Sequence, residues 1–315
     1  MSVAVPVIST DEGELLRHAL PTALEQDDVE VVVIDNASSD STAAVAAELG
    51  VRTVRLDERH SWPRAANAAL RSAAGDPVLF MQPDCYLEPG FVAAARRRLD
   101  EPGVGSVAPK LVRTLGPQPG QRLDAIDAAG MVVDRRRKNA LVGHGRPALA
   151  HDRPGRAFGA DGAVALYRRE ALEDAAVDGQ VVDEQLEAWG SDADLAWRLR
   201  LLGWRCVYEP TATAHHVRTF SPSTRSRMPD WDRMVQFRNR LLMMAKNDPL
   251  ESLMRDLPTV AAYELAALAY AVLVERALLR GYVEAARMLP DMLRKRRALQ
   301  ARRKALPPLG LEPPP

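Results

Sequence analysis

The sequence predicts an α/β fold, with a mostly parallel sheet flanked by helices and a helical region at the end of the chain. The first observation is that short apolar runs, typical of strands, alternate with segments of helical pattern in the first part of the chain. The second is the near-continuously apolar run at 29–34 (VEVVVI), which indicates a parallel strand covered on both faces. The third is the wholly helical pattern that begins at about residue 228.

Each element follows from its local pattern. Apolar, β-branched runs predict strands at 3–8, 29–34, 51–56, 77–81 and 159–168. Helical patterns predict helices at 14–24, 43–49, 62–74 and 191–202. In the last of these, Ser191 is a good N-cap, Asp194 completes a variant of the capping box, and Gly203 ends the helix. The segment 111–157, rich in Gly, Pro and Arg, predicts hairpins and loops.

Composition narrows the classes of protein that the chain can represent. Its 315 residues suit one large α/β domain with an appendage, and the formal net charge of zero gives no overall attraction to nucleic acid. The only two cysteines, Cys85 and Cys206, lie far apart, so we expect buried, reduced thiols rather than a disulfide or zinc site. The N-terminal segment lacks the pattern of a secretory signal, which favours a cytoplasmic location.

Polar clusters follow two of the predicted strands. Asp35 begins the cluster DNASSDST after 29–34, and Asp84 follows Gln82 and Pro83 after 77–81. Ligands of open α/β sheets bind at the carboxyl ends of strands, so both clusters are candidate binding sites. A structural role is the alternative: an Asx-turn at Asp35, a turn at Asp84, and helix capping by Ser38 and Asp40.

Four segments in order resemble glycosyltransferase family 2, and within it the bacterial rhamnosyltransferase-like members. They are VVVIDNASSDST; the stretch from Arg64 and Asn67 to AAGDPVLFMQPD; VVDEQLEAWGSDADLAWRLRLLGW; and EPTATAHH. The resemblance runs from about residue 3 to 247. It implies a GT-A fold, which is a Rossmann-like, mostly parallel sheet with flanking helices, and transfer of a sugar from a nucleoside diphosphate.

The resemblance also implies a domain organisation. We expect a GT-A catalytic domain at 1–227, with a nucleotide-binding half at about 1–110 and an acceptor half at about 111–227. A C-terminal helical region at 228–306 and a disordered tail at 307–315 follow. By resemblance, the nucleotide contacts Asp35, Asn36, Ser38, Arg64 and Asn67.

A divalent cation, Mg²⁺ or Mn²⁺, would neutralise the departing diphosphate, and carboxylate oxygens suit such a cation. Asp84 is the best candidate ligand, and Gln82 stands where the family pattern has its first Asp. By resemblance His216 is a second ligand, with His215 as second choice; the alternative is a pair of histidines in the core or on the surface.

Asp192 keeps the position of the family's general base, although Ser191 replaces the usual Glu before it. The base would take the acceptor proton in a single, inverting displacement. The alternative is that acids at a helix start serve the helix itself, which is the role expected of Asp194. The helix field is expected to lower the pKa of Asp192 and keep it ionised.

Other residues have less specific roles. By resemblance, donor or acceptor contacts fall on Asp161, Gly162, Trp189 and Arg238. Trp189 either stacks on a sugar or fills the core, and Arg238 either meets the diphosphate or forms an ordinary ion pair. Arg198 and Arg200 are expected on the exposed face of their helix.

The tail combines a strongly helical, apolar segment at 256–289 with a basic one at 294–304. Glu264 and Glu275 favour an amphipathic helix over a membrane span. The tail predicts either peripheral binding to the anionic inner face of the cell membrane or packing, including between two copies of the chain.

The partners expected are a dTDP- or UDP-linked sugar, with rhamnose favoured by resemblance alone, and a glycan or polyprenyl-linked acceptor; nucleic acid is not expected. The rivals are a soluble enzyme that makes a small glycoside and a catalytically inactive nucleotide-sugar-binding or scaffolding relative. Gln82 and Ser191 motivate the inactive relative.

Overall fold

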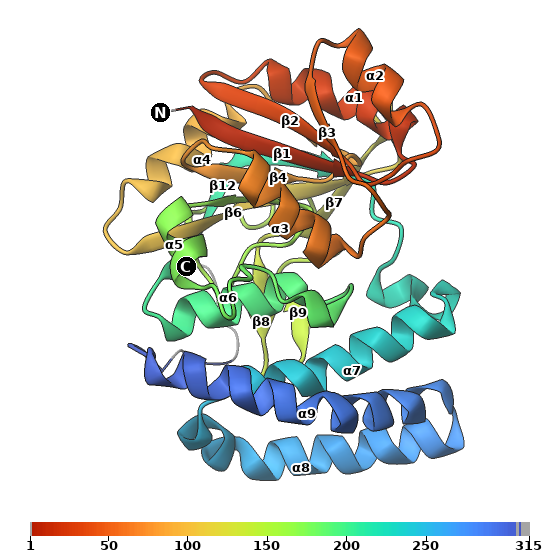
Figure 1. Ribbon diagram of the computed structural model, residues 1–315, viewed down its shortest axis with the longest axis vertical. Helices are drawn as coiled ribbons and strands as arrows, with labels where there is room; N and C mark the ends of the chain where they lie inside the picture. Colours follow the sequence, from red (N-terminus) through yellow and green to blue (C-terminus); the bar gives the residue numbers. More distant parts are fainter. Residues whose placement is uncertain (1, 307–308, 310–315) are drawn as a thin grey trace.

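The computed structural model describes residues 2–306 and residue 309, apart from the side chains of 222 and 223. Figure 1 shows a central sheet with helices on both faces, and a stack of three long helices, α7 to α9, at one end of the molecule. The α/β class and the helical C-terminal region predicted from the sequence are both confirmed. Residues 307, 308 and 310–315, most of the predicted disordered tail, lie outside the described residues.

The main sheet has ten strands, in the order β10-β12-β6-β11-β4-β1-β2-β3, with β5 paired to β12 and β7 to β6. The half containing β1 to β4 is parallel, whereas β11 runs antiparallel to both β4 and β6. A separate hairpin joins β8 and β9. The strands are β1 (Val3–Ser9), β2 (Val29–Asp35), β3 (Arg52–Arg55), β4 (Val78–Met81), β5 (Cys85–Leu87), β6 (Val104–Thr114), β7 (Arg122–Ala128), β8 (Met131–Val133), β9 (Asn139–Leu141), β10 (Gly155–Ala157), β11 (Val164–Tyr167) and β12 (Arg205–His216).

Of the six helices in the first part of the chain, α1, α2, α3 and α6 lie close to their predicted positions, whereas α4 and α5 were not predicted. They are α1 (Gly13–Leu24), α2 (Thr42–Glu48), α3 (Trp62–Ser72), α4 (Phe91–Leu99), α5 (Arg169–Asp174) and α6 (Ser191–Leu201). The C-terminal helices are α7 (Asp230–Asn247), α8 (Leu250–Leu273) and α9 (Ala277–Ala301), and short 3-10 turns are η1 (Pro119–Gln121), η2 (Glu184–Leu186) and η3 (Pro222–Arg227).

The apolar run of β2 is explained by its place in the sheet. Val32 and Ile34 pack into the core cluster on one face of the sheet, whereas Val31 and Val33 pack into the cluster on the other. Successive side chains of a strand point to opposite faces, so a strand covered on both faces must be apolar at every position. Both cysteines are buried and unbridged, as expected.

The start of α6 differs from its prediction. The N-cap is Gly190, in a left-handed conformation with φ 86°, and Ser191 is the first helical residue. Asp194 is fully buried and makes no cap: its carboxylate accepts hydrogen bonds from Arg198 Nε at 2.9 Å, Lys246 Nζ at 2.9 Å and Asn247 Nδ2 at 2.7 Å. Arg198, predicted on the exposed face, is 1% exposed because its guanidinium also donates to the carbonyls of Ala175 and Val181.

The basic segment 294–304 is largely occupied within the molecule. Arg294 pairs with Asp178 at 2.6 Å, Lys295 with Asp183 at 2.6 Å, and Arg302 with Asp174 at 3.2 Å. Asp174 and Asp178 lie in and just after α5, at the edge of the sheet domain. The end of α9 therefore fastens the helical region to the sheet domain.

Candidate functional site

The polar clusters predicted from the sequence meet at one edge of the sheet. β1 and β2 are aligned so that Ser9 lies opposite Asp35, the last residue of β2. β4 lies on the other side of β1, with Met81 opposite Val7, and the segment from Gln82 to Asp84 follows directly. This edge lies at the carboxyl ends of three parallel strands, where open α/β sheets bind their ligands.

Asp35 is fully buried and engaged on both oxygens. Its Oδ1 accepts a hydrogen bond from the Ser38 backbone N–H at 2.8 Å, which is the Asx-type turn left open by the sequence. Its Oδ2 pairs with Arg55 Nη1 at 2.5 Å. The Ser38 hydroxyl accepts from the Asp11 backbone N–H at 3.1 Å instead of capping a helix. These contacts fix the conformation of the loop after β2. A ligand could therefore bind only to polar groups on the surface of this loop.

Of the other three nucleotide candidates, Asn36 lies in the loop after β2, whereas Arg64 and Asn67 lie in α3. The Asn36 amide exchanges hydrogen bonds with the backbone of His60, at 2.8 and 2.9 Å, and so fixes the entry into α3. Arg64, in the first turn of α3, has a half-exposed side chain. Asn67 is buried, and its amide exchanges hydrogen bonds with the backbone of Val182, at 2.8 and 3.0 Å. The structure thus gives Asn67 a structural partner, whereas Arg64 takes part in an exposed ion pair, with its Nη2 3.9 Å from Glu58 Oε1.

A candidate metal centre is formed where β5 meets β12. His216 pairs with Cys85 across these strands, which brings the imidazole beside Asp84. Asp84 Oδ2 and His216 Nε2 lie 3.4 Å apart, and ligand atoms of Asp84, Cys85 and His216 all lie within 4.8 Å of one another. Burial raises the pKa of Cys85 well above its usual value, so its thiol stays protonated. A carboxylate with an imidazole is a donor set that Mn²⁺ or Mg²⁺ can use.

The structure distinguishes between the two histidines. Adjacent residues of a strand point to opposite faces, so His215 is directed away from Asp84, and its Nε2 lies 2.9 Å from Glu88 Oε1. His216 is directed inward: its Nδ1 lies 2.7 Å from Asp127 Oδ2. Burial opposes the charged form of His216, but the hydrogen bonds to Asp127 and Asp84 outweigh it and raise its pKa to about 9. A bound cation would displace that proton.

Four residues of this edge were not singled out from the sequence: Asp127, Arg218, Arg55 and Glu12. Arg218 Nε donates to Asp127 Oδ1 at 2.6 Å, and its Nη2 donates to Asp161 Oδ2 at 2.9 Å. Burial, with the charge of Asp84 nearby, raises the pKa of Glu12 to about 7. Asp127 lies in β7, whose irregular register with β6 could not be read from the sequence. Alternation of polar and apolar residues in RLDAIDA is the only signal that Asp127 gives.

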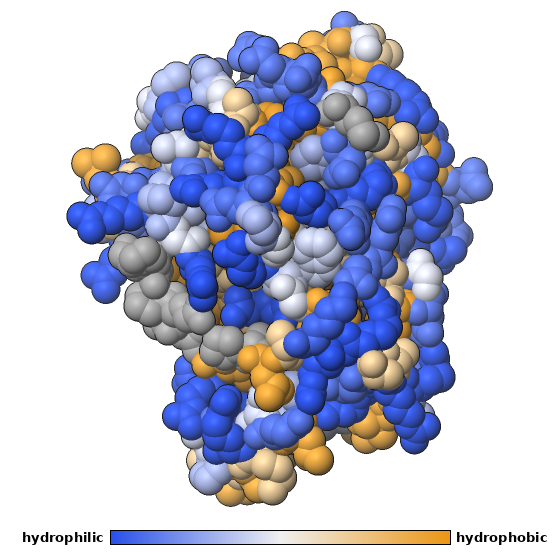
Figure 2. Space-filling model, turned by 90° about the vertical axis from the view of Figure 1, so that its left-hand side faces the viewer, coloured by the Kyte–Doolittle hydropathy of each residue, from blue (hydrophilic) through white to orange (hydrophobic). Residues whose placement is uncertain are grey.

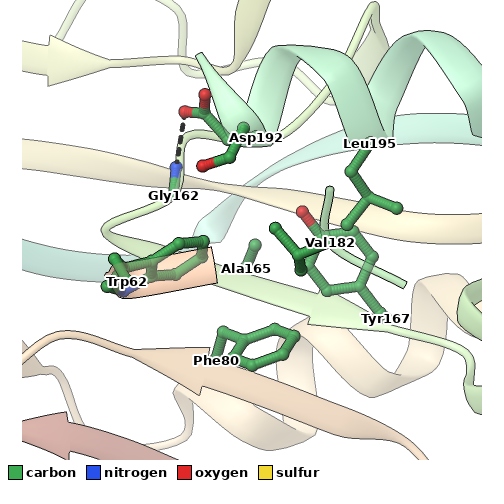
Figure 3. Close-up of a pocket in the computed structure, with 9 residues that line it drawn as sticks. Trp62, Phe80, Gly162, Ala165, Tyr167, Val182, Asp192 and Leu195 are labelled. Carbon is green, nitrogen blue, oxygen red and sulfur yellow. Dashed lines mark hydrogen bonds between the residues drawn. The ribbon is translucent and has the colours of Figure 1, made fainter. Parts of the chain in front are cut away.

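Asp192 stands in the first turn of α6 and reaches back toward β11. Its Oδ2 accepts from the Gly162 backbone N–H at 3.1 Å (Figure 3). Its Oδ1 accepts from the Ala193 backbone N–H at 2.8 Å. Gln82 Nε2 donates to the Gly162 carbonyl at 3.2 Å, so Gly162 joins the strand end at Gln82 to Asp192. Gln82 therefore has a structural partner where the family pattern has an Asp.

The electrostatic expectation for Asp192 is wrong. Burial raises its pKa to about 6, and the charge of Asp161 adds to the rise, whereas the two backbone hydrogen bonds and Arg218 only partly oppose it. The field at the start of α6 therefore does not decide the protonation of this carboxylate. A carboxylate with a pKa near 6 is well suited to accept a proton at neutral pH.

A narrow pocket opens beside Asp192. Figure 3 shows aromatic and aliphatic side chains from α3, β4 and β11 pointing into it below the carboxylate. Phe80 packs edge to face against Tyr167, with ring centres 6.1 Å apart, and at a tilt of 53° against Trp62, with ring centres 6.2 Å apart. The lining residues are Trp62, Phe80, Gly162, Ala165, Tyr167, Val182, Ser191, Asp192 and Leu195.

The remaining candidates are held by partners within the chain. Trp189 Nε1 donates to Asp232 Oδ1 at 2.8 Å, and its ring packs edge-on against Phe220. Arg238 is 3% exposed and pairs with Glu187 and Glu284, each at 3.0 Å. The structure thus gives Arg238 the ordinary ion pairs that the sequence left open, and it leaves Trp189 only partly buried at the start of α6.

Comparison with known proteins places the chain in a family. The family model "Glycosyl transferase family 2" matches residues 2–175. A pre-mycofactocin glycosyltransferase of Mycobacterium tuberculosis is 27% identical over 235 residues, which are 73% of this chain and 44% of that protein. The uncharacterized protein MT1568 of the same species is 35% identical over 120 residues, 36% of this chain and 37% of that protein. The chain thus spans less than half the length of either relative.

Solved structures share the fold. The mannosyltransferase PcManGT from Pyrobaculum calidifontis, in complex with GDP-Man and Mn²⁺, aligns with a TM-score of 0.54 and 23% identity over 95% of this chain and 84% of its own. S. aureus TarS 1-349, in complex with UDP-GlcNAc, aligns with a TM-score of 0.61 and 16% identity over 95% of this chain and 88% of its own. The chain belongs to glycosyl transferase family 2, and its fold is the GT-A fold.

Proposed function

We propose that this protein is a metal-dependent, inverting glycosyltransferase that moves a sugar from a nucleoside diphosphate to a hydroxyl of its acceptor. One observation carries the proposal. A buried carboxylate of raised pKa, Asp192, is joined through Gly162 and Gln82 to the end of β4, where Asp84 lies beside His216 of β12. A proton acceptor and a candidate cation site on one sheet edge are what displacement of a diphosphate requires.

The donor would lie along the carboxyl ends of β1, β2 and β4. The loop of Asp35, Asn36 and Ser38 offers a preformed polar surface for the base and ribose, and the half-exposed Arg64 offers positive charge for the diphosphate. Asp84 and His216 would hold a divalent cation, which would neutralise charge on the departing diphosphate. Members of the same fold were solved with GDP-Man and Mn²⁺ and with UDP-GlcNAc, which supports a nucleotide-sugar donor.

Asp192 would accept the proton of the attacking hydroxyl. Its two backbone hydrogen bonds hold the carboxylate in place, and Asp161 and Gly162 border it on the side of β11. Attack from the face opposite the leaving diphosphate inverts the anomeric carbon in one step. The apolar lining of the adjacent pocket supports a 6-deoxy sugar such as rhamnose, because a methyl group there needs no hydrogen-bond partner.

Release of nucleoside diphosphate tests the catalytic proposal. The protein is incubated with dTDP-rhamnose, UDP-glucose and GDP-mannose, each with Mn²⁺ or with chelator, and diphosphate is quantified with and without a polyprenyl-linked glycan acceptor. The proposal expects Mn²⁺-dependent release from one donor class, accelerated by acceptor. If the protein binds a donor but releases no nucleoside diphosphate with any acceptor class, it is instead a catalytically inactive protein that binds nucleotide sugars.

We also propose that the acceptor is lipid-linked and that α8 rests on the membrane where this acceptor lies. All exposed side chains between 257 and 274 are uncharged, and Glu264 is turned inward to Arg240. α8 is the one described helix long and apolar enough to cross a membrane, and 17% of its most apolar window is buried. Figure 2 shows apolar residues at the lower end of the molecule, where α8 lies in Figure 1. Co-sedimentation with anionic vesicles tests the association.

A further inference from the structure

We propose that Asp127 is a positioning residue of the metal centre, which holds the His216 imidazole so that its Nε2 faces Asp84. The inference rests on the proposed function, because it concerns the same cation site. It assigns a role to a residue that neither the family pattern nor the sequence had singled out. The proposal needs three things from the structure: a fixed carboxylate, a fixed imidazole and a ligand atom that faces Asp84.

The carboxylate is fixed by its surroundings. Asp127 is fully buried in β7, and its backbone carbonyl lies 2.8 Å from the ring Nδ1 of His144. Arg218 Nε donates to Oδ1 at 2.6 Å, which leaves Oδ2 for His216. Arg218 is itself held at its other end by Asp161. Asp127 therefore cannot turn toward another partner without breaking a buried, charge-assisted hydrogen bond.

The imidazole is fixed in turn by the carboxylate. His216 Nδ1 lies 2.7 Å from Asp127 Oδ2, and a carboxylate can only accept there, so Nδ1 carries the proton. When the imidazole is neutral, the lone pair is then on Nε2, the nitrogen that lies 3.4 Å from Asp84 Oδ2. Metal-binding histidines commonly donate their second N–H to a carboxylate, which sets the ring orientation and increases the basicity of the ligand nitrogen.

His215 provides an internal comparison. It is the neighbouring histidine and is similarly buried, but its Nδ1 has no hydrogen-bond partner among the described residues. Its Nε2 is taken by Glu88. Of the two histidines, only His216 has one nitrogen held by a carboxylate and the other directed at a candidate ligand. The opposing explanation is that Asp127 serves only as the counterion of Arg218. The two explanations predict different metal affinities for a protein in which Asp127 is replaced.

The test measures Mn²⁺ binding directly, by the electron paramagnetic resonance signal of free Mn²⁺ titrated with protein in the absence of nucleotide. Asp127→Asn is expected to weaken Mn²⁺ binding about 10- to 100-fold. His216→Ala weakens it too, and adding Asp127→Asn to His216→Ala should cause no further loss. Asp174→Asn is the matched control. It also removes a carboxylate that pairs with an arginine, Arg302, but Asp174 lies in α5 and not at the candidate metal centre. It should bind Mn²⁺ like the unsubstituted protein.

An unchanged Mn²⁺ affinity in Asp127→Asn, or a full additional loss in the double variant, would overturn the inference and leave the proposed function standing. Absence of Mn²⁺ binding by the unsubstituted protein would contradict the metal role in the proposed function, and this inference with it.

A measurement on the unsubstituted protein covers the case in which Asp127→Asn does not fold. Long-range ¹H–¹⁵N spectra with saturating Mg²⁺ report the tautomer of each histidine, and His216→Ala identifies the signal of His216. We expect a proton on Nδ1. A proton on Nε2 would overturn the proposal.

Discussion

Asp192 illustrates how a side chain takes its properties from its surroundings rather than from its place in a sequence motif. A position at a helix start suggested a lowered pKa. Burial and the charge of Asp161 instead raise the pKa to about 6. Neither contribution can be read from SDAD, because Asp161 lies just before β11, far from α6 in the sequence. The sequence could single out Asp192 as a candidate base, but it could not predict that its pKa is raised.

Replacing Asp192 with Asn should reduce the rate of sugar transfer about 10²- to 10⁴-fold, because the acceptor hydroxyl would lose its general base. The fold should survive, since burial already disfavours the charged form of this carboxylate. Diphosphate release and thermal unfolding, measured on the same preparations, check both expectations. Full transfer activity in a folded Asp192→Asn protein would show that another group takes the proton.

The same pKa predicts a pH dependence. The base must be ionised to act, so kcat/KM should be level above pH 7 and fall about tenfold per pH unit well below the pKa of about 6. Rates should be measured at saturating Mn²⁺, so that loss of metal at low pH does not imitate the effect. An acid limb centred near pH 4, the ordinary range of a carboxylate, would contradict the raised pKa.

At the scale of elements, the clearest difference from the sequence prediction is the buried cluster between α6, α7 and α9. Lys246 of α7 contacts both Asp183, at 2.5 Å, and Asp194, at 2.9 Å. Although burial opposes it, Lys246 and Arg198 hold the pKa of Asp194 below its usual value. The periodicity of 191–202 correctly predicted a helix, but that pattern cannot show which distant residues face it. For this reason the sequence suggested that Asp194 caps the helix. Its partners Lys246 and Asn247 lie about fifty residues further along the chain.

Lys246→Met should destabilise the protein by about 3–5 kcal/mol at pH 7, because it leaves two buried carboxylates short of a counterion. Arg17→Met is the control: Arg17 pairs with Glu48, but both side chains are about half exposed, and such a pair contributes little to stability. Urea unfolding of the three proteins gives the comparison. Equal stability of the Lys246 and Arg17 variants would show that the cluster does not hold α7 to α6.

For the whole molecule, the order and type of the elements were largely predictable. Apolar strands covered on both faces, and the turn residues after them, are local signals, and they located the edge that carries Asp35 and Asp84. The C-terminal region was predicted to be helical, but not how it is attached. The basic end of α9, for which the sequence left membrane binding and packing both open, pairs with acids of the sheet domain. The surface for the proposed membrane contact is therefore the set of uncharged, exposed side chains at 257–274.

Substituting Gln for Leu265, Leu268 and Leu273 together should abolish co-sedimentation with anionic vesicles, because these side chains make up the most apolar part of that face, at 70%, 44% and 81% exposed. Leu115→Gln with Leu149→Gln is the matched control, since both leucines are exposed, at 68% and 85%, outside the helical region. Diphosphate release from a soluble donor should be unchanged in both. A triple variant that still sediments with the vesicles would contradict membrane contact through this face. A native protein that is a dimer by size-exclusion chromatography and does not sediment would favour contact between two copies of the chain.

The central claim is that one edge of the sheet binds a nucleoside diphosphate together with a divalent cation. The most direct measurement is the thermal unfolding of the native protein with UDP, dTDP and GDP, each with and without Mn²⁺. A ligand that binds only the folded state raises the unfolding temperature in proportion to the logarithm of its concentration over Kd. The account predicts a rise with one of these nucleotides that requires Mn²⁺ and is lost in Asp84→Asn. No rise with any nucleotide, or a rise that is unchanged in Asp84→Asn, would contradict it.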